Sequence, residues 1–211
     1  MKKGEGTVQK KEAKAVLFDM DGVLINSSNA WFGAFNDVLV HFGLKPISKR
    51  KFSGIFGNPI EKDKEMFFKN QSIKEIESAF NHFFKKWKCY AVLFKDSIPV
   101  LKNLRAKKVR IGLITNATSE IVNTNLKQFK MKKFFGAVVT MDDVKRRKPA
   151  PDMILKACKI LKVEPKNTIL VGDTKNDMIA GKRAGCITVG YKIKGDYCIN
   201  SLIEIEKFIY V

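Results

Sequence analysis

Short apolar runs alternate with amphipathic helical patterns over most of this chain, and this alternation constrains the fold more than any other feature. The first run, Ala15 to Phe18, is rich in residues that favour buried strands and predicts a strand at about 14–19. After residue 97, helical patterns separate further runs, and the chain is expected to end in a helix near 200–208. These later runs predict strands at about 109–114, 137–140, 168–171 and 186–189. The alternation indicates an α/β fold whose parallel sheet is covered by helices on both faces and binds ligands at the carboxyl ends of its strands.

A block of helical patterns without a strand signal, at about 26–95, separates the first strand from the rest of the chain. Apolar residues at helical spacing run from Trp31 to Phe42 and predict one amphipathic helix. A loop rich in Pro and Gly follows, and a second helix is expected at about 60–69. A third helix is expected from Ser72, because a Glu three residues later completes a capping-box pattern.

The composition is that of a folded globular protein. Its 211 residues fit one domain with at most a modest insertion, and its 45% hydrophobic residues, sixteen of them Phe, can build a sizeable core. The apolar runs are much shorter than the roughly 18 residues of a membrane span, and residues 1–14 lack the apolar region of a secretory signal, so we expect a cytoplasmic protein. The four cysteines form no C-x-x-C pair, which argues against a zinc site and for reduced thiols.

The formal net charge of +19 has three possible explanations. Lysine and arginine could bind nucleic-acid phosphates, they could attract a small anionic substrate, or they could reflect a lysine-rich composition without a function. The basic residues are spread along the whole chain, and no nucleic-acid-binding motif accompanies them. We therefore favour substrate attraction and composition over a nucleic-acid partner.

Two carboxylates, Asp19 and Asp21, follow the first predicted strand, with Gly22 directly after them. Residues at positions i and i+2 of a strand point the same way, so the two carboxylates would converge if the extended geometry continues. Converging like charges are unfavourable unless a cation lies between them. The pair therefore indicates either a metal-assisted site, with one carboxylate as nucleophile and the other as acid and base, or only an Asp-Gly turn.

Three further groups of polar residues follow predicted strands or the loops beyond them. Thr115 and Asn116 end the strand at 109–114 and could hold a phosphate oxygen or cap a helix. Lys148 precedes a Pro-rich loop that could hold its ammonium group in place, where it could neutralise a carboxylate or a phosphoryl group. Asp173 and Asp177 follow the strand at 168–171 and could face the same metal site or cap the next helix.

Taken together, these motifs resemble the haloacid dehalogenase superfamily, and in particular its phosphatase branch with a helical cap inserted after the first motif. The resemblance extends from about Lys14 to the end of the chain. The motifs are, in order, Asp-x-Asp-Gly-Val-Leu, Ile-Thr-Asn, Lys-Pro-x-Pro-Asp and Gly-Asp-x-x-x-Asp-x-x-Ala-Gly-x-x-Ala-Gly. The resemblance implies a Rossmann-like three-layer core with a parallel sheet, formed by residues 1–25 and 97–211, and an α-helical cap at 26–96.

The resemblance also implies a role for each catalytic residue. Asp19 would attack phosphorus to form an aspartyl-phosphate, and Asp21 would protonate the leaving oxygen and then activate water. Thr115 and the Asn116 amide would hold the phosphoryl oxygens. Lys148 would offset the negative charge that builds in the transition state.

A Mg²⁺ ion is the cofactor that the resemblance implies. Its ligands would be the Asp19 carboxylate, the backbone carbonyl of Asp21 and Asp173. Asp177 would help directly or through water. An all-oxygen ligand set of this kind suits Mg²⁺.

The resemblance implies hydrolysis of a small phosphomonoester, such as phosphoglycolate, a sugar phosphate or a nucleotide. The dehalogenases lack an acid at the position of Asp21, and β-phosphoglucomutases carry a serine-rich segment where this chain has Ile-Thr-Asn. A mutase is the nearest alternative, and a non-catalytic nucleic-acid-binding or scaffolding protein on the same fold is the alternative from another class. Asn26 and Arg147 depart from the usual pattern and leave the substrate open; Arg146 and Arg147 are interpreted as solvated surface residues rather than contacts to an acidic substrate.

Overall fold

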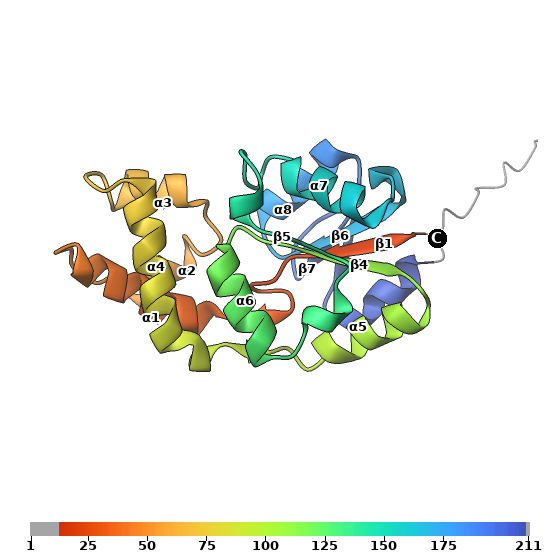
Figure 1. Cartoon of the computed structure of the whole chain (residues 1–211), viewed down its shortest axis with the longest axis horizontal. Helices are drawn as coiled ribbons and strands as arrows, with labels where there is room; N and C mark the ends of the chain where they lie inside the picture. The colour runs from red at the N-terminus through yellow and green to blue at the C-terminus, as the bar shows by residue number, and fades with distance from the viewer. Residues whose placement is uncertain (1–12, 210–211) are drawn as a thin grey trace, which may run out of the picture.

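A six-stranded parallel sheet forms the centre of the computed structural model, which describes residues 13–209 (Figure 1). The strand order is β5-β4-β1-β6-β7-β8, and every neighbouring pair is parallel. The strands are β1 (Ala15–Phe18), β4 (Arg110–Ile114), β5 (Ala137–Val139), β6 (Thr168–Gly172), β7 (Ile187–Tyr191) and β8 (Tyr197–Ile199). The predicted α/β fold class is confirmed.

Strand β1 lies in the middle of the sheet because its side chains are apolar on both faces. Val16 and Phe18 pack into one hydrophobic cluster with residues of α5 (Ser97–Ala106) and α6 (Ser119–Gln128). Ala15 and Leu17 point to the other face and pack with residues of α7 (Asp152–Leu161) and α8 (Lys175–Ala184). The alternation of side chains along a strand thus produces a core on each face, which makes three layers.

Four helices between β1 and α5 form a separate group beside one end of the sheet (Figure 1). They are α1 (Ser28–His41), α2 (Lys49–Ser53), α3 (Ile60–Met66) and α4 (Ile73–Trp87). A third apolar cluster, built mainly from phenylalanine rings such as Phe35, Phe68 and Phe80, lies within this group. The capping box at Ser72 is present, with Glu75 bound to the Ser72 backbone N–H at 2.7 Å.

Two parts of this helical segment differ from the prediction. Helix α2 forms where a loop was expected, and the Ser48 side chain caps it. Strands β2 (Ile25–Asn26) and β3 (Val92–Leu93) pair antiparallel at the two ends of a region that was predicted to contain no strand. Strands of two residues carry no readable periodicity, so only the contact between distant segments reveals them.

The C-terminal region also differs from the prediction. The 3₁₀ run Leu202–Phe208 replaces the expected α-helix, and it starts at a capping box between Ser201 and Glu204. Strand β8 was not predicted, because two of its three residues are exposed and its sequence has no buried apolar run. It pairs with β7, which extends to Tyr191 instead of ending at 189.

No helix in the part of the chain that the structure describes is both long enough and apolar enough to cross a lipid bilayer. Residues 1–12, most of the basic segment at the N-terminus, lie outside the described residues.

Close packing of α1 on α4 yields a test of the helical segment. A Cβ atom at Gly33 would lie 2.1 Å from the Trp87 ring, and that ring is held by a hydrogen bond from its Nε1 to Asp37. We expect Gly33→Ala to destabilise the protein by about 1–3 kcal/mol through overpacking, despite the better helix propensity of Ala.

Denaturant unfolding measures this change, and Gly54→Ala is the matched control. The nearest atom to a Cβ at Gly54 is 3.5 Å away, and the backbone there is in the right-handed helical region. A Gly33→Ala protein as stable as the control would contradict the packing.

Candidate active site

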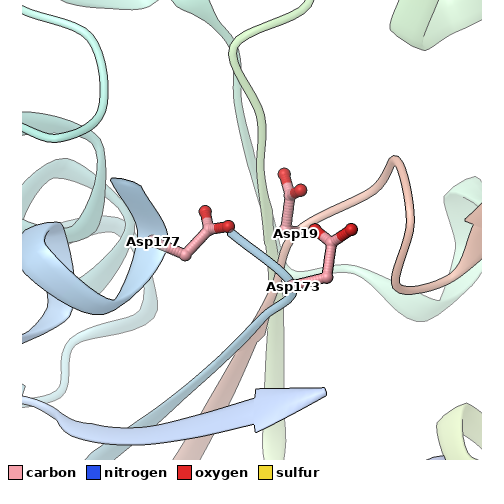
Figure 2. A group of neighbouring side chains, drawn as sticks. All are labelled: Asp19, Asp173 and Asp177. Carbon is pink, nitrogen blue, oxygen red and sulfur yellow. The ribbon is translucent and has the colours of Figure 1, made fainter. Parts of the chain in front are cut away.

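The polar residues singled out in the sequence gather at the carboxyl ends of the central strands. Asp19 directly follows β1, Thr115 follows β4 and Asp173 follows β6. Figure 2 shows that the Asp19 and Asp173 side chains lie side by side at the ends of neighbouring strands, while Asp177 approaches them from the first turn of α8. Because parallel strands end at one edge, residues more than 150 positions apart share one site.

Three carboxylates form a compact acidic cluster at this edge. One oxygen from each of Asp19, Asp173 and Asp177 lies within 4.8 Å of the others. A single buried ammonium partly neutralises them: the Lys148 Nζ donates to Asp19 at 2.6 Å and to Asp177 at 2.7 Å. Three carboxylates therefore share one ammonium group.

Asp173 is the member of the cluster that has an unpartnered buried oxygen. Its buried Oδ1 has no hydrogen-bond partner within residues 13–209. The close approach of its carboxylate depends on Gly22, where a Cβ atom would lie 1.9 Å from the Asp173 Oδ2 and φ is +82°. An unpartnered carboxylate oxygen beside an excess of negative charge fits a divalent cation with oxygen ligands.

Burial dominates the acid–base properties of the cluster. It raises the pKa of Asp19 well above the usual range, although the Lys148 ammonium opposes the shift. It also raises the pKa of Asp173 to about 7, with a further contribution from the Asp177 carboxylate. Burial works against the charged form of Lys148, but the attraction of Asp177 and Asp19 is larger and raises its pKa. The lysine therefore stays charged while the cluster around it favours an added cation.

Asp177 serves as the link between α8 and the lysine. Its Oδ2 accepts hydrogen bonds from the backbone N–H and the hydroxyl of Thr174, which closes a capping box at the helix start. Its Oδ1 accepts from Lys148. Both interpretations of the second aspartate, as helix cap and as a member of the charged site, thus describe the same side chain.

The Asp21 carboxylate lies apart from the acidic cluster. Its Oδ1 accepts hydrogen bonds from the Ser27 hydroxyl at 2.5 Å and from the Trp31 indole N–H at 3.0 Å. Burial raises the pKa of Asp21, and these two hydrogen bonds oppose the shift. The side chains of Asp19 and Asp21 therefore have different partners.

Sequence reasoning missed Ser27 and Trp31 as partners of Asp21. The sequence indicated Trp31 as the first residue of an apolar helix face, and Ser27 directly precedes that helix. The only available signal was that both residues lie close in sequence to the Asp-x-Asp motif. This proximity leads to a contact because the chain turns at Gly22, where φ is positive.

Asn116 contacts Lys148 through its side chain. Its amide nitrogen donates to the Lys148 carbonyl and its amide oxygen accepts from the Lys148 backbone N–H, both at 3.1 Å. This paired contact positions the loop that carries the lysine. The Thr115 hydroxyl accepts from the Ala117 backbone N–H at 3.2 Å and lines the same pocket as Asp19.

The pocket above Asp19 lies between the sheet edge and the helical segment. Its floor contains Asp19, Asp21, Thr115 and Lys148, and its opposite wall comes from α1 to α4 and the loops between them. Phe52, Phe56 and Phe80 belong to that wall. The site is therefore completed by residues from two separate parts of the sequence.

Arg147 is not the solvated surface residue that the sequence suggested. Its side chain is only 16% exposed and bridges the two parts of the protein, contacting Glu77 at 2.5 Å and Glu61 at 3.2 Å. Both glutamates belong to the helical segment. Arg146, in contrast, is 72% exposed and pairs with Asp152 on the surface, as expected. The sequence could not separate these neighbours because only the position of α3 and α4 decides which one is covered.

The comparison with protein families identifies the chain. A family model described as haloacid dehalogenase-like hydrolase matches residues 16–191. The chain therefore belongs to the haloacid dehalogenase-like hydrolases, and it is an enzyme of the hydrolase class, as its motifs predicted.

Among its relatives is a protein named pyrophosphatase PpaX from Anoxybacillus flavithermus. It is 33% identical over 187 residues, which cover 85% of each chain. A protein named phosphoglycolate phosphatase from Neisseria meningitidis is 28% identical over 189 residues, covering 85% of this chain and 80% of that one.

The solved structures agree with the fold. A haloacid dehalogenase-family hydrolase from Entamoeba histolytica superposes with a TM-score of 0.81 at 21% identity and covers 93% of this chain and 97% of its own. CbbY from Rhodobacter sphaeroides, solved with xylulose-1,5-bisphosphate, gives a TM-score of 0.80 at 19% identity and covers 94% and 100%.

The Arg147 bridge predicts a difference in stability between two adjacent arginines. Arg147→Met would leave the partly buried Glu77 without its cation, and we expect a loss of about 1–3 kcal/mol in the free energy of unfolding. Arg146→Met is the control, because it removes the same charge from an exposed pair. Denaturant unfolding of both variants should separate them, and equal effects would show that the bridge contributes nothing.

Proposed function

We propose that this hydrolase is a Mg²⁺-dependent phosphatase that acts on a small phosphomonoester through an aspartyl-phosphate at Asp19. The single observation that carries the proposal is the position of Asp19. Its side chain is 8% exposed, is paired with the Lys148 ammonium, and lies on the floor of a pocket that also contains Asp21 and Thr115. A buried carboxylate in such a place is equipped for covalent catalysis. The relatives named as phosphatases support the same reaction class.

The first half of the reaction forms a bond and breaks another. An Asp19 oxygen attacks phosphorus, and the bond from phosphorus to the leaving oxygen breaks. Asp21 donates its proton to that oxygen, so the alcohol leaves uncharged. The raised pKa of Asp21 supports this step, because burial favours the protonated form that the step requires.

The second half releases inorganic phosphate. Asp21, now ionised, takes a proton from a water molecule, whose oxygen attacks phosphorus and displaces the Asp19 carboxylate. Lys148 keeps one positive charge beside Asp19 through both halves, which stabilises the charge on the transferring group. The Thr115 hydroxyl and the Asn116 backbone amide would hold the phosphoryl oxygens.

The acidic cluster would hold the cation. Asp19 and Asp173 are the candidate side-chain ligands, with the Asp21 backbone carbonyl, while Asp177 has both oxygens in hydrogen bonds and would contribute through a remaining lone pair or through water. When bound, Mg²⁺ would neutralise negative charge on the phosphoryl oxygens. The unpartnered Asp173 oxygen supports this assignment.

The helical segment would act as a cap over the catalytic core, with residues 26–96 as the cap and 1–25 with 97–211 as the core. Its own apolar cluster, the β2–β3 pair at its base and the pocket beneath it support this division. A cap that closes over the site would exclude water and select the substrate.

Replacing the nucleophile tests the mechanism directly. Asp19→Asn keeps the size of the side chain but removes its nucleophilic oxygen, and we expect turnover to fall by about 10³-fold or more. The measurement is phosphate release from a panel of phosphomonoesters with Mg²⁺, with excess chelator as the metal-free control. Full activity in the variant, or native turnover that is unchanged in excess chelator, would rule out the mechanism.

Replacing the proton donor separates its two functions. Asp21→Ala removes the side chain but keeps the backbone carbonyl, so Mg²⁺ binding should be retained while turnover falls by about 10²- to 10⁴-fold. Titration calorimetry with Mg²⁺ and the phosphate-release assay measure the two properties. A variant that loses Mg²⁺ binding would place the Asp21 side chain among the ligands.

The phosphate-release assay also distinguishes a hydrolase from a mutase. It is run with a sugar phosphate as substrate, and the product is analysed for an isomerised sugar phosphate.

A further inference from the structure

The wall of the pocket opposite Asp19 is strongly apolar. Besides Trp31, whose indole N–H binds Asp21, its apolar side chains come from the helical segment and are Phe35, Phe52, Ile55, Phe56, Ile60 and Phe80. Given the proposed function, the phosphoryl group would lie on the floor beside Asp19, so these side chains would surround the leaving group. Aromatic and aliphatic walls favour a ligand part that buries apolar surface.

The charged residues of the pocket make the leaving-group region unfavourable for an anion. Among the described residues that line the pocket, Lys148 is the only cation, and it is already paired with Asp19 and Asp177. The helical segment contributes two acids instead, Asp63 and Glu77. An anionic leaving group would therefore meet carboxylates and no unpaired positive charge.

Arg147 does not change this balance. Its guanidinium contacts Glu77 and Glu61, so one positive charge faces two carboxylates in that group. Arg147 also does not belong to the residues that line the pocket. Moving it toward a substrate would leave both glutamates without their partner.

Asp63 makes the wall unfavourable for a second negative charge. It lies on α3 and receives one long hydrogen bond, 3.4 Å, from the Asn58 side chain. Burial raises the pKa of its carboxyl to about 7, which reflects how poorly this place accommodates negative charge. A carboxylate or phosphate of the substrate would lose hydration here without gaining a cation.

We infer that the substrate, within the proposed phosphatase reaction, is a phosphomonoester whose leaving group is uncharged and largely apolar, with an aromatic ring as the best match to the wall. This differs from what the names of two relatives describe. Pyrophosphate and phosphoglycolate have leaving groups that carry a phosphate and a carboxylate. Both would place a second anion against Asp63 and Glu77.

Non-hydrolysable phosphonates test the inference without relying on turnover. Benzylphosphonate presents an aromatic ring, 3-phosphonopropionate presents a carboxylate, and methylenediphosphonate presents a second phosphonate. With the native protein and Mg²⁺, we expect calorimetric titration to show benzylphosphonate binding at least about tenfold tighter than either of the others. Equal affinities, or tighter binding of an anionic phosphonate, would overturn the inference.

Inorganic phosphate distinguishes failure of this inference from failure of the proposed function. Phosphate contains no leaving group and reports only on the floor of the site. If phosphate binds and the three phosphonates do not differ, the leaving-group assignment is wrong and the phosphatase assignment stands. If neither phosphate nor any phosphonate binds, both are wrong.

A pair of variants on one helix tests the electrostatic part. At about pH 8, above the pKa of about 7 that burial gives the Asp63 carboxyl, Asp63→Asn removes one negative charge from the pocket, and Glu65→Gln removes one from the exposed side of α3. We expect Asp63→Asn to tighten the binding of 3-phosphonopropionate about three- to tenfold, with benzylphosphonate changed by less than about twofold. Glu65→Gln should change neither ligand. If Asp63→Asn and Glu65→Gln behave alike, the charge of Asp63 does not exclude anions.

Discussion

The contact of one buried ammonium with two buried carboxylates is the interaction on which the site depends. Lys148 is 3% exposed and lies between Asp19 and Asp177, which reach it from β1 and α8. Buried like charges would repel one another and lose hydration, so the three groups can be buried only because they are paired. The same arrangement leaves the buried Oδ1 of Asp173 without a hydrogen-bond partner within residues 13–209, and an oxygen of this kind fits a divalent cation. The stability of the sheet edge and its proposed chemistry thus come from one set of charges.

The fold supplies the framework that makes this arrangement possible. Strand β1 pairs with β4 on one side and β6 on the other, in registers that bring Phe18 opposite Leu113 and Val171. The residues that follow these strands therefore emerge together. Lys148 is less directly fixed, because it lies on a loop, and the Asn116 side chain holds that loop through its backbone. Much of the site is built by such supporting contacts rather than by the reactive groups themselves.

The helical segment contributes to the site in two ways. Its Trp31 and the preceding Ser27 hold the Asp21 carboxylate, and its phenylalanines form the wall of the pocket. Arg147 ties the loop beside Lys148 to Glu61 and Glu77 of this segment. The position of the segment is therefore coupled to the floor of the pocket by two hydrogen bonds, an ion-pair group and apolar contacts. The proposed preference for an apolar leaving group follows from this wall and not from the floor.

The sequence by itself determined the fold class and brought forward Asp19, Asp21, Thr115, Lys148, Asp173 and Asp177, because buried strands and the motifs after them depend on local order along the chain. Tertiary structure decided which of these groups meet. In the sequence, Trp31 is only one apolar residue on a predicted helix face, whereas in the structure its indole N–H donates to Asp21. Arg146 and Arg147 are equivalent in sequence, and only the placement of α3 and α4 covers one and leaves the other in solvent. Local patterns report which face of an element is apolar, whereas the partner of a polar side chain is set by contacts between residues far apart in the chain.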